Sequence, residues 1–267
     1  MLHGILEHHR AQAAALTTAQ RERLRTLADD RARVDPPRPF ASALRREPGS
    51  GVEGLRVIAE IKRRSPSKGA LAVGLDPAEV ALDYAAGGAA ALSVLTDEAF
   101  FGGSVEDLQA ARGAVELPVL RKDFTVAPSD VDLAAAIGAD AILLIVAGLD
   151  DSELARLHDR ALELGLGVLV EVFDEYELER ALAVAPAVIG VNQRDLRDFS
   201  VDPQRAARLA PLMGDAVAVA ESGIAGHHDA RDLAAAGFDA LLVGEHLVTA
   251  SNRTQQLKEL LHGERTL

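Results

Sequence analysis

Short runs rich in Val, Ile, Leu and Ala alternate with longer amphipathic segments from Leu55 to the end of the chain. This alternation is typical of βα units that build a parallel sheet. Eight strands are predicted, at residues 57–62, 91–95, 119–122, 141–146, 167–171, 188–192, 217–221 and 241–244. A helix is predicted after each strand, at residues 77–86, 104–113, 128–137, 151–164, 174–183, 203–209, 228–236 and 252–261.

A weak internal repeat supports this pattern. The strings GAAAL, GADAIL and GFDALL begin at Gly88, Gly138 and Gly237, and each places a glycine after a predicted helix and a strand after the glycine. Glycine suits the left-handed conformation that ends many helices. Eight regular units that close on themselves predict an α/β fold, a (β/α)8 TIM barrel. An open doubly wound sheet is the alternative, although no GxGxxG string follows the first strand.

The first part of the chain differs from the rest. Residues 1–45 are predicted to be helical up to a Pro-rich segment at 34–39, with a further turn or two at 40–46. The string EPGSGVEG at 47–54 marks a boundary, because proline and glycine interrupt helices and central strands. We therefore expect an N-terminal helical extension and linker, residues 1–54, packed on a barrel of residues 55–267 and forming one domain with it.

Composition narrows the function classes. The 267 residues are 48% hydrophobic and 26% charged, which fits an ordinary globular protein. The longest nearly apolar stretch, 181–191, contains Pro186 and Gly190 and is shorter than the ~20 residues of a membrane span. A net charge of −13 argues against a nucleic-acid partner. The chain has no cysteine, and MLHGILEHHR does not resemble a signal peptide, so a cytoplasmic protein is expected.

Charged and amide side chains occur where several predicted strands end. In a barrel these carboxyl ends meet at one rim, where TIM-barrel active sites lie. The residues at these ends are Glu60, Lys62, Lys122, Glu171, Asn192 and Glu221. Lysines and glutamates that share one opening perturb each other's ionisation, and such perturbed groups suit general acid and base catalysis.

A phosphate site is predicted beside these groups. The loop at 63–69 follows the first strand, and with Lys62 it carries four positive charges and Ser65. Its length predicts a flexible flap. Ser222 and Gly223 follow the seventh strand, and Gly244 and Glu245 follow the eighth. The loops after strands seven and eight form the usual phosphate site of these barrels.

Other sequence features give weaker indications of function. His8 and His9, like His227 and His228, are neighbours that diverge by about 100° on a helix, so we expect surface residues rather than a shared metal site. No HExxH or GxSxG string occurs, which gives no support to a zinc protease or a serine hydrolase. Phe100 and Phe101 are expected either to line an apolar pocket for a flat ring or to seal the barrel rim.

Several strings together resemble one known family. IAEIKRRSPSKG, LSVLTDEAFFGGS, LPVLRKDF, LVEVFDEYELERAL, IGVNQRDL, AESGI and LLVGEHLV occur in the order and spacing of indole-3-glycerol phosphate synthase. The resemblance covers essentially the whole chain. It implies a carboxy-lyase of tryptophan biosynthesis that converts 1-(2-carboxyphenylamino)-1-deoxyribulose 5-phosphate into indole-3-glycerol phosphate, CO2 and water. It also implies no metal, no organic cofactor and a monomer.

The resemblance also implies residue roles. Lys122 would act as general acid on the substrate ketone, Lys62 would pair with the substrate carboxylate, and Glu171 would be the base of the dehydration. Which lysine is the acid at each step stays open. Glu60 would orient the lysines, Asn192 and Glu221 would position the substrate, and Arg194 would add a supporting charge. The phosphate shell would consist of Ser65, Ser222, Gly223, Gly244 and Glu245, the last through its backbone N–H with its side chain turned away.

Two other functions compete with this interpretation. A phosphoribosyl isomerase of the tryptophan or histidine pathway would share the phosphate loops, but the tryptophan-pathway isomerase uses a cysteine base and this chain has none. A catalytically silent barrel that binds a phosphorylated metabolite would be expected to lack Lys62, Lys122 or Glu171, and all three are present.

Overall fold

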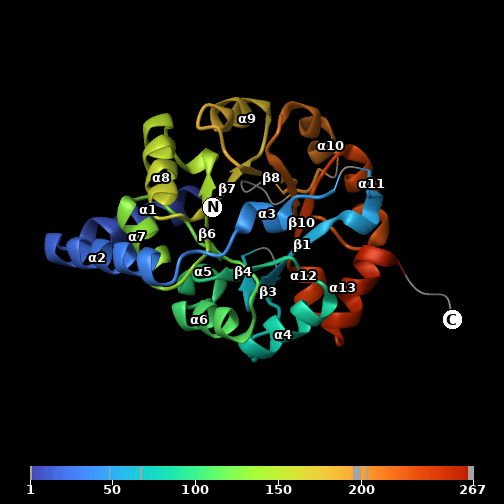
Figure 1. The fold of residues 1–267 in the computed structure, drawn as a ribbon, viewed down its shortest axis with the longest axis horizontal. Coiled ribbons are helices and arrows are strands. Elements are labelled where there is room, and N and C mark those ends of the chain that lie inside the picture. Colours follow the sequence, from blue (N-terminus) through green and yellow to red (C-terminus); the bar gives the residue numbers. More distant parts are fainter. Residues whose placement is uncertain (1, 48, 67, 195–199, 203, 264–267) are drawn as a thin grey trace.

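Eight parallel strands close into a barrel in the computed structural model, which describes residues 2–47, 49–66, 68–194, 200–202 and 204–263 (Figure 1). The strands are β1 (Arg56–Ile61), β4 (Ala91–Leu95), β5 (Val119–Lys122), β6 (Ala141–Ile145), β7 (Gly167–Val172), β8 (Val188–Asn192), β9 (Val217–Glu221) and β10 (Ala240–Val243). Because β1 pairs with both β4 and β10, the sheet has no free edge. This confirms the predicted (β/α)8 barrel and excludes the open sheet.

The main helices surround the barrel, and each follows a strand (Figure 1). They are α4 (Pro77–Gly87), α6 (Val105–Ala114), α7 (Pro128–Ala136), α8 (Asp151–Glu163), α9 (Glu175–Leu182), α10 (Arg205–Leu209), α11 (His227–Ala236) and α13 (Arg253–His262). The predicted bounds agree to within one or two residues, except that Pro203, the predicted start of the sixth helix, lies outside the described residues. Gly88 and Gly237 end their helices with φ angles of +95° and +103°, as the repeat predicted.

The inside of the barrel is built from alternate strand positions, because successive side chains of a strand point to opposite faces. Ile58, Leu120, Leu169, Val219 and Leu242 belong to one buried cluster inside the barrel. Their strand neighbours pack outward against the helices in a second cluster. The inner positions are therefore apolar in the middle of the barrel, and the next inner position along each strand faces the mouth.

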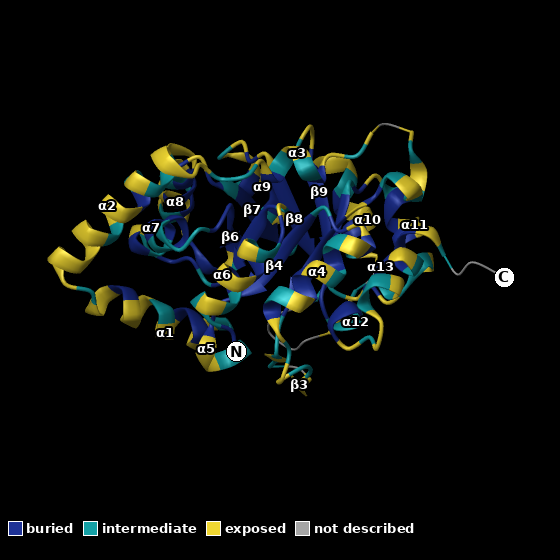
Figure 2. Cartoon of the chain, turned by 60° about the horizontal axis from the view of Figure 1, so that its bottom comes forward, coloured by how far each residue is buried: buried dark blue, intermediate teal, exposed yellow. Residues whose placement is uncertain are grey.

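The N-terminal extension consists of α1 (Leu2–Ala15), α2 (Thr18–Val34) and α3 (Phe40–Leu44). This confirms the predicted helical character of the segment before the prolines, and the structure divides it into two helices: the chain turns at Thr17, whose side chain accepts the Gln20 N–H in a capping box. Phe40 and Leu44 join the inner cluster and close the floor of the barrel. Figure 2 shows α1 on the opposite side from α3, beside α5 (Glu98–Phe101).

Short elements surround the mouth. The predicted flap after β1 contains a two-stranded hairpin, β2 (Arg64–Ser65) and β3 (Gly69–Ala70). Arg63, at the base of this hairpin, donates a 2.8 Å hydrogen bond to Asp107 and another to the Leu75 carbonyl. Two one-turn helices, α5 (Glu98–Phe101) and α12 (Glu245–Val248), follow β4 and β10. None of the described helices is both long enough and apolar enough to cross a membrane.

Candidate active site

A cavity of about 640 Å³ opens at the carboxyl ends of the barrel strands. Its size is typical of sites for small molecules. All twelve site residues that the sequence predicted line this cavity: Glu60, Lys62, Ser65, Lys122, Glu171, Asn192, Arg194, Glu221, Ser222, Gly223, Gly244 and Glu245. Five strands bring Glu60, Lys122, Glu171, Asn192 and Glu221 together at the inner position beyond the apolar barrel core, and the other seven residues follow the ends of β1, β8, β9 and β10.

Lys122 lies at the centre of the charged groups. Its Nζ is 3.4 Å from Glu171 Oε2 and 3.7 Å from Glu221 Oε2. Asn192 Nδ2 donates a 3.1 Å hydrogen bond to the other Glu171 oxygen, so that carboxylate is held from two sides. All three carboxyl and amide groups are buried, which leaves little freedom of movement around the ammonium.

Lys62 forms the second half of the cluster. Its Nζ donates a 2.6 Å hydrogen bond to Glu60 Oε1, and both side chains face the cavity while Ile61 between them packs outward. A Cβ at Gly244 would lie 2.3 Å from Glu60 Oε1 and 2.8 Å from Lys62 Nζ. The absence of a side chain at Gly244 therefore leaves room for this ion pair.

Burial and neighbouring charges together shift the pKa values of the ionisable groups in the site. Burial by itself would lower the pKa of the Lys122 ammonium, but nearby negative charge, first that of Glu171 and also that of Glu60, outweighs burial and raises that pKa. For Glu60, the nearby lysine charges outweigh burial and lower the pKa. Burial and the Glu171 carboxylate raise the pKa of Glu221 to about 8. The cluster therefore holds an ammonium and a protonated carboxyl side by side at neutral pH.

The loops after β9 and β10 form a second, less acidic part of the cavity. Ser222 and Gly223 both have left-handed backbones, with φ of +66° and +72°. The successive backbone N–H groups of such a turn can face an anion. The Glu245 carboxylate at the start of α12 lies 3.5 Å from Lys68 Nζ of the hairpin loop, so an ion pair spans this part of the mouth.

Apolar side chains line the remaining part of the cavity. Phe101 and Phe124 lie with their ring centroids 6.2 Å apart, and the other apolar residues there include Leu2, Ile5, Leu95, Leu143 and Ile145. Of the two expectations for the phenylalanine pair, Phe101 lines the cavity, whereas Phe100 contacts the ring of His8 at 5.6 Å. The cavity thus joins an apolar pocket to a charged centre and a glycine-rich rim.

Sequence reasoning missed two features of this site. Leu2 and Ile5 of α1 line the cavity, and nothing in their spacing indicates which surface α1 covers. The expectation that His9 is a surface residue was wrong, since its side chain is 12% exposed and its Nε2 lies 2.9 Å from Asp97 Oδ2. The LRKDF string offered one unused signal: Phe124 follows Lys122 closely enough to reach the same opening.

A charged acid–base cluster beside an apolar pocket, in a barrel closed by an N-terminal extension, defines a TIM-barrel enzyme for a small anionic substrate. The family model for indole-3-glycerol phosphate synthase matches residues 2–260. The chain belongs to the indole-3-glycerol phosphate synthase family.

Curated relatives agree closely in sequence and length. The indole-3-glycerol phosphate synthase of a Nocardioides species is 54% identical over 87% of this chain and 89% of its own. Indole-3-glycerol phosphate synthase 2 of Streptomyces coelicolor is 51% identical over 97% of this chain and 99% of its own. That of Mycolicibacterium smegmatis is 47% identical over 98% and 93%.

Solved structures with low sequence identity share the fold. A structure of 3-hexulose-6-phosphate synthase aligns with a TM-score of 0.62 at 16% identity, over 78% of this chain and 99% of that chain. Thiamine phosphate pyrophosphorylase from Pyrococcus furiosus aligns with a TM-score of 0.58 at 17% identity, over 78% and 94%. These likenesses concern the barrel alone.

The family fixes the reaction. This enzyme closes the indole ring of 1-(2-carboxyphenylamino)-1-deoxyribulose 5-phosphate, with loss of CO2 and water, to give indole-3-glycerol phosphate in tryptophan biosynthesis. It is a carboxy-lyase with a phosphorylated substrate. The competing isomerase and the catalytically silent barrel are thereby set aside.

Proposed function

We propose that the chain performs this ring closure with Lys122 as general acid, Glu171 as base and Lys62 as the partner of the substrate carboxylate. The single observation that carries this proposal is the position of Lys122 Nζ, 3.4 Å from Glu171 and 3.7 Å from Glu221 inside the buried cavity. An ammonium held in this way can donate a proton without a metal ion, and the carboxylates around it keep it charged.

Ring closure is the first step. When the aromatic carbon attacks the ketone, negative charge develops on the ketone oxygen, and Lys122 donates a proton to it. A raised lysine pKa does not hinder this step, because a forming alkoxide is a stronger base than an amine. The raised pKa also ensures that Lys122 carries its proton when the substrate arrives.

The Lys62 ammonium binds the substrate carboxylate that leaves as CO2. Its Nζ lies 2.6 Å from Glu60 Oε1, and a substrate carboxylate offers this ammonium an alternative partner with the same charge as Glu60. Glu60 keeps a lowered pKa beside the two lysines and therefore stays ionised, so it orients them by charge as the substrate enters.

Dehydration needs a base and an acid together. Glu171 takes the proton from the intermediate, and the Asn192 amide fixes the direction of its carboxylate through their 3.1 Å hydrogen bond. Lys122 and Lys62 are both candidates for the acid that protonates the departing hydroxyl. Glu221 stays protonated near neutral pH and positions the substrate by hydrogen bonding.

The two ends of the substrate suit different parts of the cavity. The phosphate binds to the glycine-rich rim through Gly223, Gly244 and the N–H of Glu245, with Ser65, Ser222 and Arg194 nearby. The Glu245 carboxylate pairs with Lys68 and so need not face the phosphate. The carboxyphenyl ring occupies the apolar pocket beside Phe101 and Phe124. Binding at both ends holds the flexible ketose in a reactive geometry.

The test compares Lys122→Met with Lys258→Met, a change at an exposed lysine on α13. Indole fluorescence reports product directly, because the protein contains no tryptophan. We expect Lys122→Met to lower kcat by about 100-fold or more while inorganic phosphate binding stays within about tenfold. Lys258→Met should behave as the unchanged protein. Near-normal turnover by Lys122→Met would refute the acid role.

The finer expectations about partners and location remain predictions. A monomer fits an extension that covers part of the barrel surface. The charge of −13 opposes nucleic-acid binding by long-range repulsion. A biosynthetic role fits the cytoplasm. Size-exclusion chromatography with light scattering tests the first of these directly, since a monomer has a mass of 28.2 kDa.

A further inference from the structure

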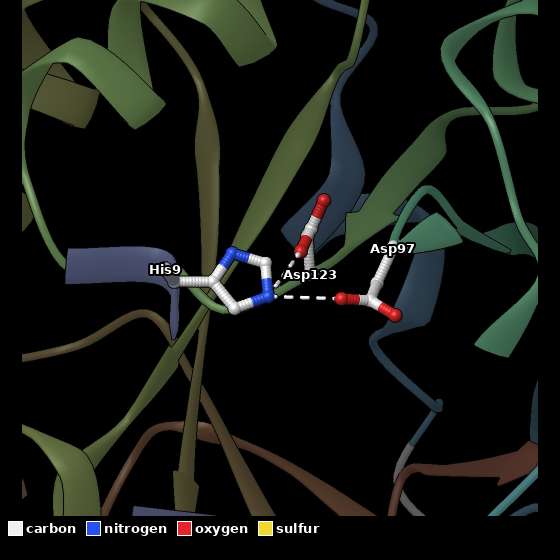
Figure 3. A group of neighbouring side chains, drawn as sticks. All are labelled: His9, Asp97 and Asp123. Carbon is white, nitrogen blue, oxygen red and sulfur yellow. Dashed lines mark hydrogen bonds and ion pairs between the residues drawn. The ribbon is translucent and has the colours of Figure 1, made fainter. Parts of the chain in front are cut away.

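His9 of α1 contacts two aspartates that lie far away in the sequence (Figure 3). Its Nε2 is 2.9 Å from Asp97 Oδ2, at the start of α5, and 3.8 Å from Asp123 Oδ1, just after β5. The side chains of Asp97 and Asp123 are 2% and 4% exposed. A helix of the extension is therefore joined to the barrel rim by a buried polar contact.

The aspartates are themselves fixed by the barrel. Asp97 Oδ1 accepts the N–H groups of Phe100 and Phe101, which leaves Oδ2 facing the imidazole. Burial opposes ionisation of Asp97, but the hydrogen bonds from His9 and from these N–H groups lower its pKa, so it is a carboxylate. Because a carboxylate only accepts hydrogen bonds, the His9 Nε2–H is the donor.

Asp123 is oriented from the opposite side. Arg121 donates a 2.8 Å hydrogen bond to its Oδ2, and the Phe124 N–H donates a 2.8 Å bond to its Oδ1. Its Oδ1 is also the atom that faces His9. The His9 ring lies against Phe124, with the ring centroids 5.2 Å apart. The imidazole therefore faces Asp123, the residue directly after Lys122, and lies against the Phe124 ring beside it.

The same face of α1 forms a wall of the active site. Leu2, Ile5 and His9 are spaced three and four residues apart, which places them on one side of a helix. Leu2 and Ile5 line the cavity, and Ile5 is 5% exposed. Arg10, next to His9, binds the Gly148 carbonyl and Glu153 on another part of the rim. Contacts on both sides of the helix fix its rotation.

We propose that His9 is a positioning residue for the ring end of the substrate: by binding Asp97 and Asp123 it holds Leu2 and Ile5 against the apolar pocket. This inference rests on the proposed function, in which that pocket receives the carboxyphenyl ring. Loss of the contact frees α1 to rotate or lift, and the ring then loses one apolar wall. The charged cluster and the phosphate rim keep their own contacts.

The experiment compares His9→Gln with His8→Gln, a matched change at the exposed neighbouring histidine. We expect His9→Gln to raise KM for the carboxyphenylamino substrate about tenfold and to leave kcat within about threefold. The inhibition constant of inorganic phosphate should be unchanged, because phosphate does not contact α1. His8→Gln should leave all three constants unchanged. An unchanged KM for His9→Gln, or an equal loss of phosphate binding, overturns the proposal.

A second variant guards against misfolding and against a different interpretation of the cluster. Asp97→Asn keeps the cap of α5, since asparagine caps helices as well as aspartate does. It should raise KM by a similar factor, and the double variant should add little to either single change. Zn²⁺ that raises the melting temperature of the unchanged protein but not of His9→Gln would assign the three groups to a metal instead and overturn the proposal. Failure of the unchanged protein to form indole would contradict the proposed function, not the role of His9.

Discussion

Asp140 and Asp239 make the same pair of hydrogen bonds at two separate places in the barrel. Each residue directly precedes a strand, and its Oδ2 accepts a backbone N–H of the preceding strand at 2.9 Å. Each Oδ1 accepts a backbone N–H of the extension, from Arg38 at 3.0 Å and from Arg46 at 3.2 Å. Two copies of the repeated glycine motif therefore each contain an aspartate that attaches the extension to the floor of the barrel.

Asp140→Ala should destabilise the protein strongly. Asp140 is fully buried and also binds Arg31 and Arg112, so its removal takes away the buried carboxylate of both guanidinium groups and leaves them the exposed Asp35 as a partner. We expect a loss of about 3–5 kcal/mol in the free energy of unfolding, measured in urea. Asp30→Ala, at an exposed aspartate of α2, should change it by less than about 0.5 kcal/mol.

The same urea experiment tests whether the extension and the barrel form one domain. We predict a single transition, coincident by far-UV circular dichroism and by fluorescence of the two tyrosines, of which Tyr84 is buried on α4. Two separate transitions in the unchanged protein would show that residues 1–54 unfold independently.

Glu221→Gln should change how stability depends on pH. An unfolded glutamic acid loses its proton near pH 4.5, whereas folded Glu221 keeps it until about pH 8. Between these values the folded state binds more protons, so this residue lowers stability as pH rises. Glutamine removes this effect. The difference in free energy of unfolding, variant minus unchanged protein, should therefore rise from pH 5 to pH 8 by at most about 1.4 kcal/mol per pH unit. If the free energies of unfolding of the two proteins changed in parallel with pH, that result would contradict the raised pKa of Glu221.

Glu171→Gln should reduce turnover without weakening substrate binding to the same extent. The amide keeps the shape of the side chain but cannot accept a proton, so we expect kcat to fall by about 10²–10⁴ with KM within a few-fold. Glu163→Gln, at an exposed position at the end of α8, is the control. A similar proportional loss in both variants would argue against a base at Glu171.

Gly190→Ala should impair catalysis although residue 190 carries no functional group. An added Cβ would lie 2.2 Å from Glu221 Oε1 and 3.1 Å from Leu169 Cδ1, so the carboxyl group must move. We expect kcat to fall about tenfold or more, with a stability loss of about 1–3 kcal/mol from overpacking. Gly113→Ala has open space around its Cβ and should leave kcat unchanged. Normal kcat in Gly190→Ala would show that the position of Glu221 is not critical.

The strands and helices of the barrel, and the rim on which its polar side chains gather, could be predicted from the sequence. Alternation along each strand places Glu60 two residues after Ile58, Lys122 after Leu120 and Glu171 after Leu169, so an apolar core and a polar mouth follow from local pattern alone. Because the strands are parallel, their carboxyl ends meet at one rim, whatever the sequence of the segments that connect them.

The placement of the extension was decided only by the tertiary structure. The sequence shows α1 as a helix with apolar positions, but not that Leu2 and Ile5 line the cavity or that His9 contacts Asp97 and Asp123, because α1 meets residues that are distant in the chain, 88 positions away for Asp97. The same holds for Glu221: its pKa depends on burial and on Glu171 and Lys122, which are distant in the chain. Local periodicity determines elements and faces, whereas contacts and charge states depend on how those faces pack.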